Sequence, residues 1–324
     1  MKSIQKLQKT WLISGSSKGL GFSLLIKLLK SGYNVAAFTR KKESIEDSII
    51  EFENEEGSDK IDKTNLMIVQ VDITNNEIVK KSIEQVIERF EMIDVVVNCA
   101  GYGLFGAFEF CNEQEVFNQF QVNLFGMFNV VRNSIPYLRC HSDADKNLLG
   151  PRIYNISSIC GFFSSFAGIS MYNSSKAAID GFSESLNAEL KEKNIHVTTV
   201  NIGGLRTSFL KPNGDMVLAK DNNRDTYKSA TDIIDKHYNE FNGHQLGDPN
   251  KVANILITMA TNNPQPPMHL FLGSDSICLA QLKLKLLSEE IDKYKSISTS
   301  INFDESKPFE LSQYISSSSS STQK

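Results

Sequence analysis

The stretch TWLISGSSKGLGFSLLIKLLK, residues 10–30, places a short apolar segment, a glycine-rich turn and an amphipathic segment in direct succession. Trp11-Leu12-Ile13 has the length and apolar character of a buried strand. Four leucines recur at helical spacing between Leu20 and Lys30, and Gly32 stands where a glycine ends many helices. The stretch therefore predicts a strand, a tight turn and a helix.

The same alternation continues to about residue 280. Further strands are predicted at Val35–Thr39, Leu66–Val71, Ile93–Val97, Arg152–Ile156, Ile195–Val200 and Leu270–Leu272. Helices are predicted around Ile45–Ile50, after Thr74 as N-cap, over Glu113–Leu138 and Ser170–Lys191, after Asp248 as N-cap, and over Leu282–Tyr294. Alternating strands and helices form a parallel sheet that is covered on both faces. The fold class is therefore α/β, a doubly wound parallel sheet of the Rossmann type with three α/β/α layers.

Three parts of the chain differ in composition. Residues 1–9 are predicted to be an N-terminal arm, and residues 10–280 one Rossmann-type domain with substrate loops at about 204–247. Residues 281–324 are predicted to hold a C-terminal helix and a tail that ends in six consecutive serines, Ser316–Ser321. A serine-rich tail of this kind is expected to be disordered.

Bulk composition excludes several classes of function. The net charge is -4 and no Lys/Arg run is interleaved with aromatics, which argues against nucleic-acid binding. No run of 18 or more apolar residues predicts a transmembrane helix, and no signal peptide is recognised. The five cysteines form no C-x-x-C pair, so neither a metal site nor a disulfide framework is expected. Free thiols favour a reducing, cytoplasmic location.

The glycine spacing of the first turn is suited to a dinucleotide. Gly15 can take a positive φ as the chain leaves the strand, and Gly19 lets the backbone approach a pyrophosphate at the helix N-terminus. Gly21 is expected to let the helix lie close to the sheet. A glycine-rich loop alone has a purely structural explanation, but its place after the first strand of a βαβ unit favours a nucleotide site.

The end of the second strand bears on the choice of nucleotide. NAD-binding proteins usually place an acidic residue there to hold the ribose hydroxyls. This strand instead leads into Arg40, and Lys18 adds a second cation in the turn. These residues favour NADP(H) over NAD(H), although both could be ordinary surface charges.

Tyr172 and Lys176 are four residues apart and therefore share one face of a helix. A nearby ammonium stabilises a phenolate, so Lys176 is expected to lower the pKa of Tyr172 toward the working range of a general acid or base. Together with the glycine turn, this pair makes the chain resemble the short-chain dehydrogenase/reductase family over about residues 10–210. Other landmarks follow in the order of that family: Asp72, Asn98-Cys99-Ala100-Gly101, Asn123, Ser157-Ser158 and Tyr172-Asn173-Ser174-Ser175-Lys176.

The resemblance implies catalytic roles for four residues. Tyr172 would be the general acid or base, and Lys176 would also hold the nicotinamide ribose. Ser158 would bind the reacting oxygen, and Asn123 would hold a water that relays protons to Lys176. Tyr172 follows Ser158 by 14 positions, about one more than the family leads us to expect, so Ser157 is a second candidate.

The resemblance also implies cofactor contacts along the strand ends. The implied residues are Gly15, Ser17, Lys18, Gly19, Leu20, Arg40, Asp72, Ile73, Asn98, Ala100, Gly101, Tyr172, Lys176 and Thr207. One departure affects the loop before Thr207. Ile202 stands where the family usually has proline, which puts the rigidity of that loop in question.

These features predict an NADP(H)-dependent oxidoreductase that interconverts an alcohol and a ketone or aldehyde. Loop aromatics suggest an apolar small-molecule substrate, such as a lipid, retinoid or steroid-like compound: Phe105, Phe108, Phe162, Phe163, Phe166 and Phe209. The alternative is a catalytically idle NADP-binding sensor or scaffold, which the presence of all four expected catalytic residues disfavours. An epimerase or dehydratase is also disfavoured, because such relatives usually have a longer sugar-nucleotide domain. The apolar Glu113–Leu138 helix and the Ser170–Lys191 helix suggest a homodimer or homotetramer.

Overall fold

The computed structural model describes residues 9–55, 60–144, 149–211, 214–221, 223–303, 306–307 and 309–310. The chain divides into two compact units, Met1–Ala280 and Gln281–Lys324. Most of the predicted N-terminal arm and the predicted serine-rich tail lie outside the described residues.

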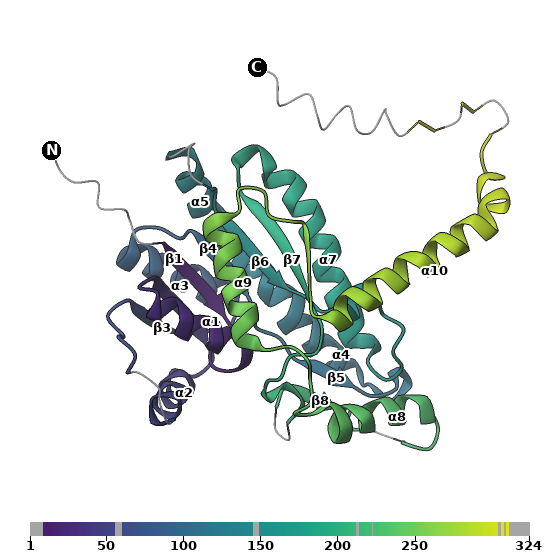
Figure 1. Ribbon diagram of the computed structural model, residues 1–324, viewed down its shortest axis with the longest axis horizontal. Coiled ribbons are helices and arrows are strands. Elements are labelled where there is room, and N and C mark those ends of the chain that lie inside the picture. Colours follow the sequence, from purple (N-terminus) through teal and green to yellow (C-terminus); the bar gives the residue numbers. More distant parts are fainter. Residues whose placement is uncertain are drawn as a thin grey trace. The chain divides into compact units, whose positions relative to one another are not determined.

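A parallel seven-stranded sheet forms the centre of the first unit, in the order β3-β2-β1-β4-β6-β7-β9 (Figure 1). Its strands are β1 (Thr10–Ser14), β2 (Asn34–Thr39), β3 (Leu66–Gln70), β4 (Val95–Asn98), β6 (Arg152–Ile156), β7 (His196–Ile202) and β9 (His269–Leu272). All seven predicted strands are confirmed. Strand order reverses between β1 and β4, and ligands bind at such a switch point in open α/β sheets.

Two separate hydrophobic clusters show that both faces of the sheet are covered. Trp11 and Ile13 of β1 belong to one cluster, with α1 (Gly19–Lys30), α2 (Glu43–Asn54) and α9 (Pro249–Asn262). Leu12, between them in sequence, belongs to the other cluster. That cluster includes side chains from α3 (Asn76–Phe90), α5 (Met127–Ala144) and α7 (Ser170–Leu190). Because successive strand residues point to opposite faces, the predicted three-layer α/β/α architecture is confirmed.

Helix ends confirm one predicted cap and correct another. Asp248 caps α9, where its side chain accepts a hydrogen bond from the backbone N–H of Asn250. The predicted Thr74 cap of α3 is wrong: Asn75 is the N-cap and accepts from the N–H of Ile78. The Thr74 hydroxyl instead donates to Asp72 at 2.7 Å, so it is not free to cap the helix.

The predicted helix Glu113–Leu138 is in fact interrupted. It consists of α4 (Glu113–Phe120), the π-helical segment η2 (Gln121–Gly126) and α5, which runs on to Ala144. A π-turn inside a helix frequently marks a functional site, and Asn123 lies within this one.

The remaining elements follow the strand ends or close the chain. They are β5 (Gly103–Phe105), η1 (Phe108–Phe110), α6 (Ile159–Phe162), η3 (Lys191–Lys193), η4 (Ser208–Leu210), β8 (Met216–Leu218), α8 (Lys228–Lys236), η5 (His237–Phe241) and α10 (Ser274–Thr299). Strands β5 and β8, which sequence patterns do not predict, form a second, two-stranded parallel sheet. Helix α10 is longer than the predicted Leu282–Tyr294.

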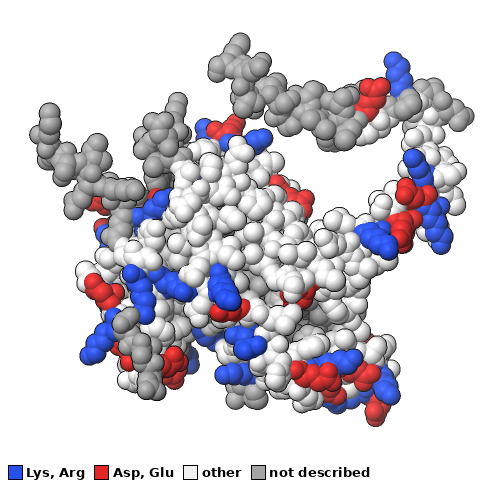
Figure 2. Space-filling model, viewed as in Figure 1, with Lys and Arg blue, Asp and Glu red and all other residues white. Residues whose placement is uncertain are grey.

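The viewed surface carries basic and acidic side chains in close mixture (Figure 2). Such a mixture does not create the continuous basic face that a duplex-binding protein normally presents. Among the described residues, no helix combines the length and apolarity needed to cross a membrane.

Candidate active site and cofactor cleft

The glycine turn has the backbone conformation expected from its sequence. Gly15 and Gly19 have φ values of 73° and 58°, a region that favours glycine. A Cβ on Gly15 would lie 2.6 Å from the Cα of Ala100, so the turn packs directly on the segment after β4. Gly21 was expected to let the helix lie close to the sheet. Its nearest contact is instead within the turn, because a Cβ added to Gly21 would lie 2.2 Å from the carbonyl oxygen of Gly15. Glycine is thus required there by the turn itself.

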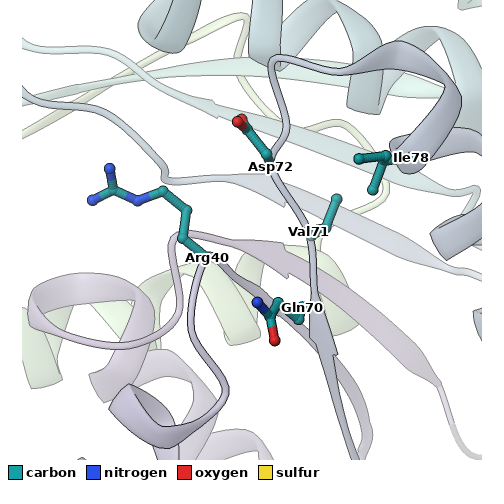
Figure 3. A pocket seen from close by; sticks show the side chains of 5 residues that line it. All are labelled: Arg40, Gln70, Val71, Asp72 and Ile78. Carbon is teal, nitrogen blue, oxygen red and sulfur yellow. The ribbon is translucent and has the colours of Figure 1, made fainter.

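A cavity of about 440 Å³ lies at the carboxyl ends of β2 and β3 (Figure 3). Its lining includes Arg40 and Asp72, two of the predicted cofactor residues, together with Gln70, Val71 and Ile78. The Arg40 guanidinium lies on the same side of the pocket as the Asp72 carboxylate in this view. Ile73 is buried at 8% exposure, and its side chain packs against Gly126.

The segment after β4 lies between the turn and the predicted catalytic residues. Asn98 donates to the Asn155 side chain at 2.8 Å, while its own Oδ1 is buried with no hydrogen-bond partner among the described residues. A Cβ on Gly101 would lie 3.1 Å from Oδ1 of Asn123 and 3.7 Å from Nζ of Lys176. Predicted cofactor and catalytic residues therefore meet at one edge of the sheet.

This edge fits a nicotinamide dinucleotide in three respects. The turn exposes backbone at the N-terminus of α1, where a pyrophosphate is favoured. The cavity offers a cation, Arg40, at the end of β2. Asn98, at the end of β4, has one buried acceptor that no described group satisfies.

The two candidate serines have different surroundings. Ser158 is the N-cap of α6 and hydrogen-bonds to the side chain of Tyr172. The Ser157 hydroxyl instead donates to the backbone carbonyl of Lys176 at 3.2 Å. The structure therefore brings Ser158, rather than Ser157, to Tyr172, and α6 begins the longer interval between them.

Tyr172 does not have the lowered pKa expected from its spacing to Lys176. Burial raises the pKa of its phenol well above the ordinary value, the thiol of Cys160 raises it further, and the hydrogen bond with Ser158 acts in the opposite direction. The Lys176 ammonium lies 5.8 Å from the centre of the Tyr172 ring. Burial dominates because Lys176 lies over the ring and donates instead to the Ile156 carbonyl at 2.7 Å.

Lys176 is itself buried, which lowers its pKa to about 8. Nearby Cys99, Asp180 and Cys160 act in the opposite direction and favour the charged ammonium. Asp180 lies one turn further along α7 and is also buried. Its carboxylate accepts hydrogen bonds from Thr199 and Asn201 at 2.5 and 2.8 Å.

Asn123 is buried within η2, and its amide is engaged with the chain around it. It accepts from the backbone N–H of Tyr102 at 3.0 Å and donates to the Tyr102 carbonyl at 2.9 Å and to Ser175 at 3.1 Å. The side chain thus joins the segment after β4 to α7. This arrangement holds Asn123 close to Lys176.

Aromatic rings border Tyr172. Phe105 stacks on it with ring centres 6.4 Å apart, and the centre of Phe209 lies 6.1 Å away. The ring of His237, from η5, meets Phe105 edge-on at 5.7 Å. Sequence patterns gave no reason to place His237 here, because the loop that carries it has no recognisable motif.

The other predicted pocket aromatics divide into groups. Phe166 packs against the same apolar cluster as Phe105, and Phe163 lies 5.6 Å from Phe166. Phe162 instead packs on Phe271 beside β9 at 5.1 Å. Phe108 is 61% exposed.

Two carboxylates near the site were not predicted. Asp275 accepts from the backbone N–H of Gly204 at 2.7 Å, and neighbouring Ser276 donates to the Asn201 carbonyl at 2.7 Å. These bonds hold the end of β7 and the loop after it; Ile202, which replaces the proline, is the last residue of β7. Asp215 forms an ion pair with Lys18 at 2.9 Å, so the predicted phosphate-binding cation already has a partner. Thr207 lies in the same region, 3.5 Å from the Cβ position of Gly19.

Residues 9–217 match the family model described as short chain dehydrogenase. The chain belongs to the short-chain dehydrogenase/reductase family. It is therefore an oxidoreductase of this family, whose fold implies a nicotinamide dinucleotide cofactor.

Relatives cover nearly the whole chain. An uncharacterized oxidoreductase of Schizosaccharomyces pombe is 33% identical over 300 residues, which are 92% of this chain and 94% of the relative. A 3-ketodihydrosphingosine reductase of Bacteroides thetaiotaomicron is 32% identical over 257 residues, 78% of this chain and 84% of the relative.

Solved structures share the fold of this chain. A short-chain dehydrogenase from Streptomyces avermitilis has a TM-score of 0.77 at 26% identity and covers 91% of this chain and 100% of its own. ElxO with NADP bound has a TM-score of 0.63 at 24% identity, and the match covers 82% of this chain and 96% of ElxO. A 3-ketoacyl-(acyl-carrier-protein) reductase from Brucella melitensis complexed with NADH has a TM-score of 0.64 at 19% identity, covering 83% and 99%. The last two share the fold alone.

Proposed function

We propose that this short-chain dehydrogenase uses NADP(H) to interconvert an alcohol and a ketone or aldehyde, with Tyr172 as the general acid or base. The observation that carries the proposal is the pairing of the Tyr172 and Ser158 side chains, with the ring centres of Phe105 and Phe209 6.4 and 6.1 Å from that of Tyr172. Two hydroxyl groups paired in this way can both hydrogen-bond to one carbonyl oxygen.

In the reducing direction, NADPH when bound supplies the hydride that adds to the carbonyl carbon. The Tyr172 hydroxyl gives its proton to the carbonyl oxygen, and the Ser158 hydroxyl hydrogen-bonds to the same oxygen. Because burial raises the pKa of Tyr172, the phenol is protonated at neutral pH, as an acid must be. Lys176 stabilises negative charge on Tyr172 after that transfer, while Asn123 positions the segment after β4.

The preference for NADP(H) rests on charge at the end of β2. Arg40 lines the cavity there, and its cation can pair with a 2′-phosphate. Structures that share this fold occur with NADP and with NADH, so the fold does not decide between them. Arg40 and Lys18 are the residues that favour the phosphorylated cofactor.

An apolar substrate is supported by the apolar cluster that adjoins Tyr172 through Phe105 and Phe209. Phe105, Ile169, Leu210 and Met216 belong to one buried apolar cluster, and Phe166 and Phe209 pack against it. One relative is named as a 3-ketodihydrosphingosine reductase, which is compatible with apolar surroundings of this kind. For this chain we propose only the substrate class, an apolar ketone or alcohol.

A homodimer or homotetramer is part of the proposal. Phe117 on α4 and Phe125 in η2 are 54% and 46% exposed on the monomer. Burying two such rings against a second copy would remove apolar area from water. A monomeric mass by light scattering at micromolar concentration would contradict this part.

The proposal is tested by NADPH oxidation against a panel of apolar ketones and aldehydes, with NADH assayed in parallel. Tyr172→Phe should lower kcat by about 100-fold or more while NADPH still binds. Tyr227→Phe is the matched control, since that hydroxyl bonds Glu109 at the surface. A wild-type protein that binds NADPH yet turns over nothing in either direction would support the idle sensor instead.

A further inference from the structure

The ion pair between Lys18 and Asp215 joins the glycine-rich turn to a segment that follows Thr207 in the chain. Lys18 stands in the glycine turn, immediately before α1, and its side chain is 44% exposed. Asp215 stands in a strap segment, residues 214–219, which leads into and through β8. Their charged groups are 2.9 Å apart.

Hydrogen bonds of its backbone groups hold Asp215 in place. Its N–H donates to the Phe209 carbonyl at 3.1 Å, and its carbonyl accepts from the N–H of Gly103 at 2.8 Å. At the other end of the strap, Ala219 donates to the Phe105 carbonyl at 2.8 Å. The pairing of β5 with β8 therefore fixes where the carboxylate lies, and the long Lys18 side chain is the movable partner.

The turn and the loop before the strap also meet at a second point. The Cβ position of Gly19 is 3.5 Å from the side chain of Thr207. The N-terminus of α1 at this turn favours anions, because its backbone N–H groups have no partners within the helix. At that site the Asp215 carboxylate pairs with the ammonium of Lys18, as an anionic ligand would.

We propose that Asp215 is a specificity-determining residue that competes with the 2′-phosphate of NADP(H) for Lys18. This inference rests on the proposed function and deepens it. When NADP(H) binds, Lys18 exchanges the carboxylate for the phosphate, and the turn is released from the strap. Asp215 thereby reduces the advantage that Lys18 gives NADP(H) over NAD(H).

The experiment measures dissociation constants of NADPH and NADH by isothermal titration calorimetry on the full chain. An exposed ion pair contributes up to about 1 kcal/mol, so Asp215→Asn should tighten NADPH binding up to about fivefold. NADH lacks the 2′-phosphate, so its affinity should change by less than about twofold. Asp221→Asn is the matched control, because it removes the same charge from an exposed position nearby and should change neither affinity.

A second pair of variants tests whether Asp215 acts through Lys18. In a Lys18→Met background, Asp215→Asn should leave NADPH affinity unchanged. Equal tightening of NADPH and NADH, or the same tightening without Lys18, would overturn the inference, as would no change at all. If Asp215→Asn fails to fold, Asp215→Ser removes the same charge and has the same expected result. A wild type that binds neither nucleotide would refute the proposed function itself.

Discussion

The carboxylate of Asp275, in the first turn of α10, accepts a hydrogen bond of 2.7 Å from the backbone N–H of Gly204. The two residues are 71 positions apart in sequence. The bond holds the loop that leads from β7 to Thr207. This part of the site therefore depends on a contact between segments that are far apart in the chain.

Asp275→Ala should loosen this loop. Losing a hydrogen bond to a charged acceptor is expected to lower the free energy of unfolding by about 1.5–3 kcal/mol. Cofactor affinity should fall as well, because Thr207 is no longer held beside Gly19. Urea denaturation and NADPH titration measure the two effects. Asp292→Ala, at an exposed position of α10, is the control; equal effects from both variants would show that the bond to Gly204 is unimportant.

Activity should depend on the charge of Lys176. Its pKa is lowered from 10.5 to about 8, so the ammonium loses its proton as the pH rises through about 8. For carbonyl reduction, kcat/KM should then fall on the alkaline side of that pH. Asp180→Asn removes a charge that favours the ammonium, so the alkaline limb should move to lower pH.

The Asp180 prediction is checked by pH profiles of kcat/KM for the two enzymes. Glu189→Gln serves as control, because it neutralises an exposed carboxylate on the same helix, α7. An Asp180→Asn profile that coincides with the wild-type profile, at whatever absolute rate, would show that Asp180 does not act on Lys176 electrostatically.

Phe209 should contribute to substrate affinity because its ring lies beside Tyr172. Removing apolar contacts from a pocket typically costs about 1–3 kcal/mol, so Phe209→Ala should lower kcat/KM for an apolar ketone by about tenfold or more. Steady-state kinetics across the ketone panel measures this effect. Phe108→Ala, at a ring that is 61% exposed, should have little effect. Phe166→Asp should likewise alter substrate preference, and unchanged preference would remove Phe166 from the pocket.

Substitution of Gly15 tests the packing of the turn, and substitution of Gly181 is its control. Gly15→Ala places a Cβ 2.6 Å from the Ala100 backbone at a positive φ, so it should destabilise the fold by more than about 1 kcal/mol and weaken NADPH binding. Gly181→Ala lies in α7, where no described atom beyond the adjacent residues and the nearby helix backbone lies within 4 Å of the new Cβ. There it should stabilise by about 0.5–1 kcal/mol. Thermal denaturation distinguishes the two; a neutral Gly15→Ala would contradict the packing of the turn on Ala100.

The sheet could be predicted because its signals are local. Buried parallel strands are short apolar runs, and each of the seven is recognisable without knowledge of its neighbours. The capping of α3 shows the limit of this reasoning. Thr74 and Asn75 are adjacent and both suit an N-cap, and the contact of Thr74 with Asp72 leaves Asn75 to accept the bond.

Contacts between distant segments could not be predicted in this way. Strands β5 and β8 have three residues each, too few for a periodic signal, and they form because backbone groups more than 100 positions apart meet. The pKa of Tyr172 also depended on tertiary structure. Helical spacing predicts proximity to Lys176, but it says nothing of burial, which determines the direction of the shift.

The sequence by itself determined the α/β architecture, the turn at Gly15 and Gly19, and the family to which the chain belongs, because each depends on residues close together in the chain. Tertiary structure alone decided which serine meets Tyr172, which carboxylate forms an ion pair with Lys18 and how Asp275 holds the loop at Gly204. Those relationships join segments separated by many residues. Their energies come from burial and from charges brought together only when the chain folds.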